Sequence, residues 1–266
     1  MFTTLINTAQ LASLLDNETG SLVILDCRFN LMDTEQGQRL YAQGHLPGAR
    51  YVHLDNDLSA PITPASGRHP LPDLDVLADK LHRWGITADT QVVVYDDCSG
   101  AMAGRAWWLL RLLGPQPVAV LDGGYPAWIA AQGAITTAPV APLSSTADTS
   151  FQTPAHAPQQ TRMLVSLIYV ESLPGGDVLV DARSPERYRG EQEPIDPVAG
   201  HIPGALNRPL QLNLDSQGVF KPADQLRAEW QALLGDTAPE AVIHYCGSGV
   251  TACHNHLAME IAGLSG

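Results

Sequence analysis

The sequence predicts an α/β protein made of two tandem copies of one domain, each with a mainly parallel sheet covered by helices on both faces. Short, almost wholly apolar runs alternate with segments of helical spacing, which is typical of buried parallel strands joined by helices. A six-residue motif also occurs twice, as GHLPGA at Gly44–Ala49 and as GHIPGA at Gly200–Ala205. Together, these observations indicate a duplicated fold.

Each copy carries three landmarks in the same order. An apolar run ends in Asp-x-Arg, the GH-x-PGA motif follows, and a second apolar run ends in a tyrosine. The residues concerned are Asp26, Arg28 and Tyr95 in the first copy and Asp181, Arg183 and Tyr245 in the second. Because both copies have them, we expect structural roles: a turn for the motif, and satisfied backbone groups at strand ends for the Asp and Arg residues.

The individual elements follow from the spacing of apolar residues. In the first copy, β-branched runs predict buried strands, and segments of period 3.6 predict helices. The expected strands are 22–25, 92–95 and 118–121, and the expected helices are 74–84, 103–113 and 126–132. Trp107 and Trp108, inside the second of these helices, are expected to pack in the core.

The linker between the copies is predicted from composition. Residues 136–161 are rich in Pro, Ala, Ser and Thr and show neither helical nor strand periodicity. We therefore expect an N-terminal domain over residues 1–137, a linker over 138–160 and a C-terminal domain over 161–266. Compared with the first copy, the second lacks residues for a final strand and a short helix, so we expect it to be truncated.

The overall composition excludes several classes of partner. Hydrophobic residues make up 45% of the 266-residue chain, and the formal net charge is −13. We expect no binding of nucleic acid or of an anionic membrane, because both need a basic surface. No apolar run could span a bilayer, and no secretory signal is visible, so we expect a cytoplasmic protein. Four cysteines favour free thiols over a disulfide framework.

The segment HYCGSGVTAC, from His244 to Cys253, is the strongest candidate for chemistry. It follows a strand predicted over Ala241–Tyr245 and leads into a helix that begins near Ala252. Glycines in the loop let backbone amides turn inward, and the helix N-terminus adds its positive end. Such a cup of N–H donors favours the thiolate form of Cys246, which predicts a nucleophile. The alternative is a buried cysteine that simply ends a core strand.

Three other chemistries fit this loop less well. A phosphate-cleaving cysteine loop needs an arginine where Ala252 stands, and a Walker loop needs a lysine where Val250 stands. A zinc site is disfavoured because His254, on a helix, points away from Cys253 and His256. We therefore expect no metal site, and we expect Cys253 to face the core.

The chain resembles the tandem-domain rhodanese superfamily over both halves. The resemblance rests on the two GH-x-PGA motifs, the two Asp-x-Arg segments and the strings GRAWWLLR, VLDGGYPAW and CGSGVTA. The cysteine loop looks most like that of 3-mercaptopyruvate sulfurtransferases. Asp96 stands at the place of Cys246 in the first copy, so the resemblance implies that this copy has lost the nucleophile. Cys27 and Cys98 are then expected to be incidental thiols.

The resemblance also implies roles for individual residues. Members of the family use an aspartate, a histidine and a loop serine as a proton relay beside the cysteine, which match Asp55, His69 and Ser248. The substrate-binding part of the loop corresponds to Gly247, Gly249, Val250 and Thr251.

The residues that would bind the carboxylate of a donor match the family only in part. One family arginine matches Arg187, but a second has no counterpart, since Ile195 and Asp196 stand near its place. Either Arg68 or Arg189 could substitute for it, and the sequence leaves this choice open.

The implied reaction moves a sulfur atom from 3-mercaptopyruvate through a Cys246 persulfide to cyanide, a small thiol or a thioredoxin-like protein, releasing pyruvate. No metal or organic cofactor is implied. Thiosulfate is an alternative donor, although the five residues after Cys246 contain no cation to hold its two charges. A binding module without catalysis is a further alternative, which the intact cysteine loop disfavours.

Overall fold

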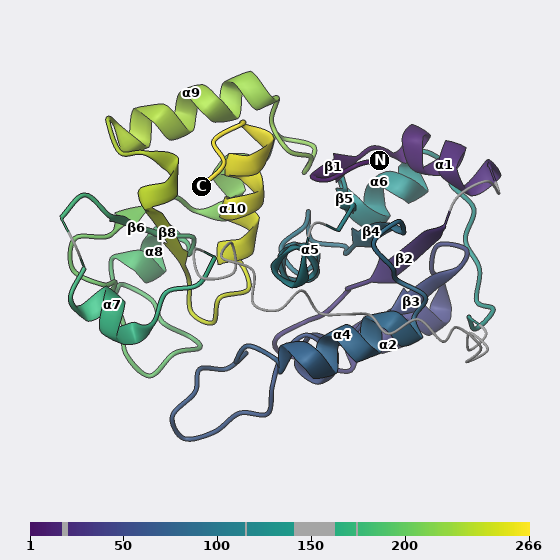
Figure 1. Cartoon of the computed structure of the whole chain (residues 1–266), viewed down its shortest axis with the longest axis horizontal. Helices are drawn as coiled ribbons and strands as arrows, with labels where there is room; N and C mark the ends of the chain where they lie inside the picture. The colour runs from purple at the N-terminus through teal and green to yellow at the C-terminus, as the bar shows by residue number, and fades with distance from the viewer. Residues whose placement is uncertain (18–20, 115, 141–162, 174) are drawn as a thin grey trace. The chain divides into compact units, whose positions relative to one another are not determined.

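The chain folds into two units, Met1–Ala157 and Pro158–Gly266, each built around a parallel sheet (Figure 1). The computed structural model describes residues 1–17, 21–114, 116–140, 163–173 and 175–266. Most of the linker predicted over residues 138–160 lies outside these ranges, so the predicted domain limits stay a prediction. In the described part of the chain, no helix is both long and apolar enough to cross a bilayer.

The first unit contains a five-stranded sheet in the order β1-β5-β4-β2-β3, with every neighbouring pair parallel. Every residue of the neighbouring strands β4 and β5 is buried, so both faces of the sheet are covered, as the continuous apolar runs predict. The strands are β1 Leu5–Ile6, β2 Leu22–Asp26, β3 Ala49–Tyr51, β4 Gln91–Tyr95 and β5 Val118–Leu121.

Alternate side chains of this sheet supply two layers of core. Ile24, Val93 and Ala119 pack with Leu11 of one helix and Trp128 of another. On β4 and β5, the helix α5 makes the main helical contacts, and Trp107 and Trp108 are buried in it as expected. The helices of the unit are α1 Thr8–Asp16, α2 Gln36–Gln43, α3 Leu54–Asp57, α4 Leu74–Arg83, α5 Ala103–Leu113 and α6 Gly124–Ala130.

Helix α6 differs from its predicted limits of 126–132. It begins earlier, at Gly124, where the N–H of Tyr125 bonds to the carbonyl oxygen of Asp96 at 2.7 Å. It ends earlier because Gln132 has a φ of 58°, a left-handed conformation that a helix cannot continue through. The N–H of Gly133 then bonds back to the carbonyl oxygen of Trp128 at 2.9 Å.

The second unit repeats the central part of this design. Its parallel sheet has the order β7-β6-β8, which corresponds to β3-β2-β4. Among the described residues, no strand pairs with the other edge of β8, the position that β5 occupies beside β4. The elements are α7 Leu167–Glu171, β6 Val178–Asp181, α8 Pro185–Tyr188, β7 Leu206–Asn207, η1 Leu210–Asn213, α9 Ala223–Leu234, η2 Pro239–Ala241, β8 Val242–Tyr245 and α10 Ala252–Ile261.

The duplicated motifs make the same contacts in both units. Arg28 forms a buried ion pair with Asp26 at 2.6 Å and donates to the carbonyl oxygen of Gly44 at 2.8 Å, which ties the Asp-x-Arg segment to the GH-x-PGA turn. The equivalent contacts in the second unit join Asp181, Arg183 and Gly200, at 2.7 Å and 2.6 Å. These repeated bonds agree with the structural roles expected from the sequence.

Candidate active site

Cys246 lies at the carboxyl end of β8, at the start of the loop that leads into α10. Its Sγ accepts a hydrogen bond from the backbone N–H of Gly249 at 3.1 Å. Gly249 has a φ of 77°, a conformation that favours glycine, and this turn aims its amide back at the sulfur. The strand, the loop and the helix start therefore lie where the sequence predicts, and at least one backbone donor faces the thiol.

The other predicted loop residues differ in exposure. Val250 is buried, so it faces the interior of the unit, and Thr251 is the residue before α10. Gly247 and Ser248 lie between the sulfur and Gly249 along the chain. The role of Ser248 in a proton relay stays a prediction.

Cys253 is a core residue, as expected. It is buried in α10, and its Sγ lies 3.2 Å from the carbonyl oxygen of Gly249. The neighbouring His254 is also buried, stacked on Phe220 at 4.6 Å and hydrogen-bonded to Asn213 at 3.2 Å. Within the described ranges, no group of three or more His, Cys, Asp or Glu residues could hold a metal ion.

The two cysteines of the first unit are in unfavourable places for a thiolate. Burial, with the negative charge of Asp26 nearby, raises the pKa of Cys27 well above its ordinary value. Burial, followed by the charge of Asp96, also raises the pKa of Cys98. Both groups are therefore held as neutral thiols, which fits their expected incidental role.

Asp96 occupies in the first unit the position that Cys246 has in the second, directly after the strand-ending tyrosine. Its carboxylate is fully buried and accepts four backbone N–H groups. The donors are Cys98 at 3.0 Å, Gly100 at 2.9 Å, and Met102 and Ala103 at 2.8 Å each. The backbone amides of this loop form a cradle around the carboxylate of Asp96, which the sequence did not predict.

Asp55 and His69 lie together in the first unit, as the family resemblance implies. Asp55, in the short helix α3, has its Oδ1 3.2 Å from Nε2 of His69, whose side chain is buried. Burial lowers the pKa of His69, and the nearby charge of Asp55 offsets this only in part. A neutral imidazole held by a carboxylate is a suitable proton carrier near neutral pH.

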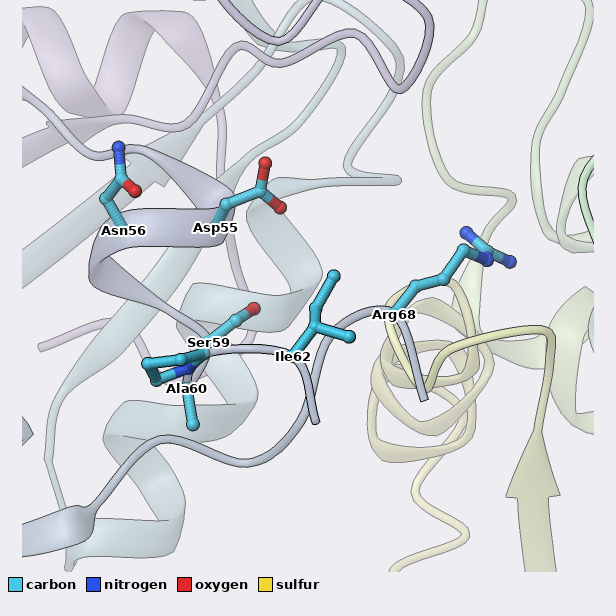
Figure 2. Close-up of a pocket in the computed structure, with 7 residues that line it drawn as sticks. Asp55, Asn56, Ser59, Ala60, Ile62 and Arg68 are labelled. Carbon is cyan, nitrogen blue, oxygen red and sulfur yellow. The ribbon is translucent and has the colours of Figure 1, made fainter. Parts of the chain in front are cut away.

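A cavity of about 320 Å³ is lined in part by Asp55 (Figure 2). Its lining includes an acidic residue, a basic residue and a serine with a buried hydroxyl, which are Asp55, Arg68 and Ser59. The full lining is Asp55, Asn56, Ser59, Ala60, Pro61, Ile62 and Arg68. The Oγ of Ser59 is buried and has no hydrogen-bond partner among the described residues.

Arg187, the predicted carboxylate anchor, is already engaged by two acids. Its guanidinium bonds to Glu193 at 2.7 Å and 3.1 Å and to Asp196 at 2.7 Å. Burial alone would raise the pKa of Glu193, but the hydrogen bonds from Arg187 and from backbone amides outweigh it and lower the pKa to about 2. Arg189, one of the two possible substitutes, pairs with Glu191 at 2.8 Å on the surface.

Sequence reasoning missed the partners of Arg187 and the place of Ser59. The acids of the segment SPERYRGEQEPID were a signal that a neighbouring arginine would be neutralised. Nothing in the spacing around Ser59 could have indicated a cavity, because this depends on how the 59–68 segment folds back toward α3.

The fold and the cysteine loop define a class of α/β proteins in which a cysteine leads an amide-lined loop at the end of a parallel strand. A family model of the rhodanese-like domain matches residues 7–131 and 169–265, and the chain belongs to this family. The predicted family and the α/β fold with two rhodanese-like segments are therefore confirmed.

Full-length relatives place the chain among sulfurtransferases. "Probable 3-mercaptopyruvate sulfurtransferase" of Pseudomonas aeruginosa is 46% identical over 264 residues, 98% of this chain and 89% of the relative. "Putative thiosulfate sulfurtransferase SseB" of Mycobacterium tuberculosis is 41% identical, covering 97% of this chain and 88% of the relative. The solved 3-mercaptopyruvate sulfurtransferase from Leishmania major has a TM-score of 0.82 at 27% identity, covering 99% of this chain and 70% of that one.

His244, two residues before Cys246 on β8, should make the second unit sensitive to acid. Burial, with the charge of nearby His256, lowers its pKa from 6.5 to about 3. The contribution of neutral His244 to the stability of the folded unit is therefore complete above pH 6.5, and it is lost as the pH falls toward 3. By pH 5 this costs about 2 kcal/mol of unfolding free energy.

Urea denaturation at pH 7 and pH 5 measures this effect. The variant His244→Phe keeps an aromatic ring against Trp230, which His244 contacts edge-on at 5.5 Å, but it cannot titrate. We expect the difference between the two pH values to be smaller in the variant. An equal difference in both proteins would show that His244 does not cause the acid sensitivity.

Proposed function

We propose that this protein is a sulfurtransferase that takes sulfur from 3-mercaptopyruvate and passes it to a thiol or to cyanide. The observation that carries the proposal is Cys246 at the end of β8, with the amide of Gly249 donated to its sulfur at 3.1 Å. The family membership and the names of the relatives support the same reaction. Under reduced, cytoplasmic conditions, the free state of all four cysteines would be maintained.

In the first half-reaction, the Cys246 thiolate attacks the sulfur of mercaptopyruvate. The new S–S bond forms a Cys246 persulfide, while the C–S bond breaks and its electron pair leaves with the pyruvate enolate. The proposal assigns Asp55, His69 and Ser248 to the proton transfers, because the enolate must gain a proton to become pyruvate. The Asp55–His69 contact at 3.2 Å supports this assignment.

In the second half-reaction, the outer sulfur of the persulfide is attacked by the acceptor. Cyanide leaves as thiocyanate and regenerates the Cys246 thiolate directly. A thiol acceptor leaves as a persulfide, which a second thiol can resolve to a disulfide and hydrosulfide. We propose a small thiol or a thioredoxin-like protein as the acceptor, because its thiolate is a nucleophile that can attack the outer sulfur. The chain's net charge of −13 disfavours association with nucleic acid or an anionic membrane.

Mercaptopyruvate should be a better donor than thiosulfate. Thiosulfate is a dianion, and the residues from Gly247 to Thr251 offer it no cationic side chain. One missing charge-assisted contact corresponds to about a ten- to hundredfold difference in kcat/KM. Measuring kcat/KM for both donors, with cyanide as the common acceptor, checks this; a thiosulfate value equal to or above that of mercaptopyruvate would reject it.

Thiosulfate transfer is the second candidate function. The relative from Mycobacterium tuberculosis that carries this name supports it.

A further inference from the structure

Gly249 is held at both of its backbone polar groups by the two cysteines of the second unit. Its N–H donates to the Sγ of Cys246 at 3.1 Å, and its carbonyl oxygen accepts from the Sγ of Cys253 at 3.2 Å. Cys253 lies four residues after Gly249, in the first turn of α10. The three residues therefore form one hydrogen-bonded series that ends at the candidate nucleophile.

The start of α10 leaves the carbonyl group of Gly249 for a side chain to satisfy. In a regular α-helix, the N–H of Cys253 would bond to the carbonyl oxygen four residues earlier. Here it bonds instead to the carbonyl oxygen of Val250, at 3.1 Å. The Sγ of Cys253 takes over the bond to Gly249, in the way that serine and threonine side chains on helices reach the carbonyl group four residues before them.

The bond from Cys253 restricts a residue that could otherwise turn. Gly249 has a φ of 77°, and glycine adopts left-handed and right-handed conformations about equally readily. A rotation of Gly249 would move its N–H away from the sulfur of Cys246. Cys253 is 5% exposed, so packing confines the side chain that holds the Gly249 carbonyl group. Gly249 is thereby kept in the conformation in which its N–H points at the Cys246 sulfur.

The direction of this N–H matters for reactivity. The thiolate is the form of cysteine that attacks sulfur. A hydrogen bond to a charged acceptor is roughly twice as strong as one between neutral groups, so the Gly249 amide favours the thiolate over the thiol.

We propose that Cys253 is a positioning residue for sulfur transfer: its thiol holds the carbonyl group of Gly249, so that the Gly249 amide stays directed at the sulfur of Cys246. Cys253 does not itself take up sulfur. This inference rests on the proposed function, in which Cys246 is the nucleophile.

Two substitutions of Cys253 separate its hydrogen bond from its packing. Serine and alanine have nearly the same volume and leave the same space in the core, but only serine can donate to the Gly249 carbonyl group. Alkylation of Cys246 by iodoacetamide at pH 7, followed by mass spectrometry, measures the reactivity of the thiol without any turnover. Cys253→Ala should slow this alkylation about three- to tenfold, the effect of losing one hydrogen bond, and Cys253→Ser should stay within about twofold of the native rate.

Steady-state kinetics give an independent measurement. In Cys253→Ala, kcat/KM should fall by the same factor for mercaptopyruvate and for thiosulfate, because the change acts on the attacking sulfur and not on the donor. The matched control Cys27→Ala removes a buried thiol of the first unit, whose Sγ lies 3.9 Å from a carbonyl oxygen, and it should change neither the alkylation rate nor kcat/KM.

The two measurements distinguish this inference from the proposed function. If the native protein turns over neither donor, the proposed function fails, and the alkylation rates still decide the role of Cys253. Equal alkylation rates in the native protein and Cys253→Ala, or equal losses in the alanine and serine variants, would overturn it.

Discussion

Replacing Cys246 by serine should abolish sulfur transfer, with kcat falling at least about a thousandfold. A hydroxyl in this place cannot form the persulfide that links the two half-reactions. The sulfur of Cys246 lies at the end of β8 and accepts from Gly249, whereas the other three thiols lack this arrangement. Steady-state assays with mercaptopyruvate and cyanide measure the loss.

Mass spectrometry of the native protein completes this test. After incubation with donor alone, the peptide that contains Cys246 should gain about 32 Da, the mass of one sulfur atom. Cys98→Ser is the matched control, because it removes a part-buried thiol of the first unit whose pKa is raised by burial. It should keep full activity, and an added sulfur found on Cys98 or Cys253 would contradict the assignment.

Asp96→Ala should destabilise the first unit by about 3–5 kcal/mol. Each buried amide left without an acceptor costs about 1–3 kcal/mol, and four amides depend on this carboxylate, although local relaxation and entering water reduce the sum. Urea denaturation followed by circular dichroism measures the change. For a unit of this size, the melting temperature should fall by about 10 °C.

The neighbouring Asp97 provides the control for this experiment. Asp97→Asn removes the same formal charge from an exposed side chain one position further along, whose carboxylate bonds to its own backbone amide and not to the four amides that Asp96 holds. We expect a change within about 0.5 kcal/mol. If both variants lose the same stability, the effect would come from net charge, and the cradle would have no special contribution.

The sequence was sufficient for the fold because its signals are local and repeated. The apolar runs that became β2, β4 and β5 have no other good interpretation, and the GH-x-PGA motifs fix matching turns in both copies. The position of Cys246 followed from the same argument, since a glycine-rich loop between a strand and a helix can hardly place its first residue elsewhere.

The surroundings of the arginines could not be predicted in the same way. Whether Arg187 is available depends on the path of the segment from Glu191 to Asp196, which brings two carboxylates within 2.7 Å of it. The cavity beside Arg68 depends on the 59–68 segment, which has neither strand nor helix periodicity. Contacts of this kind are set by the tertiary fold, and pattern analysis of one chain does not reach them.

Asp96 and Cys246 stand at the same point of the two repeated units, directly after the tyrosine that ends a strand. In the first unit, four backbone amides bond to a carboxylate, which is a fixed part of the fold. In the second unit, the amide of Gly249 bonds to the sulfur of a free cysteine. One design of loop therefore serves as a structural anchor in one half of the chain and presents a thiol in the other.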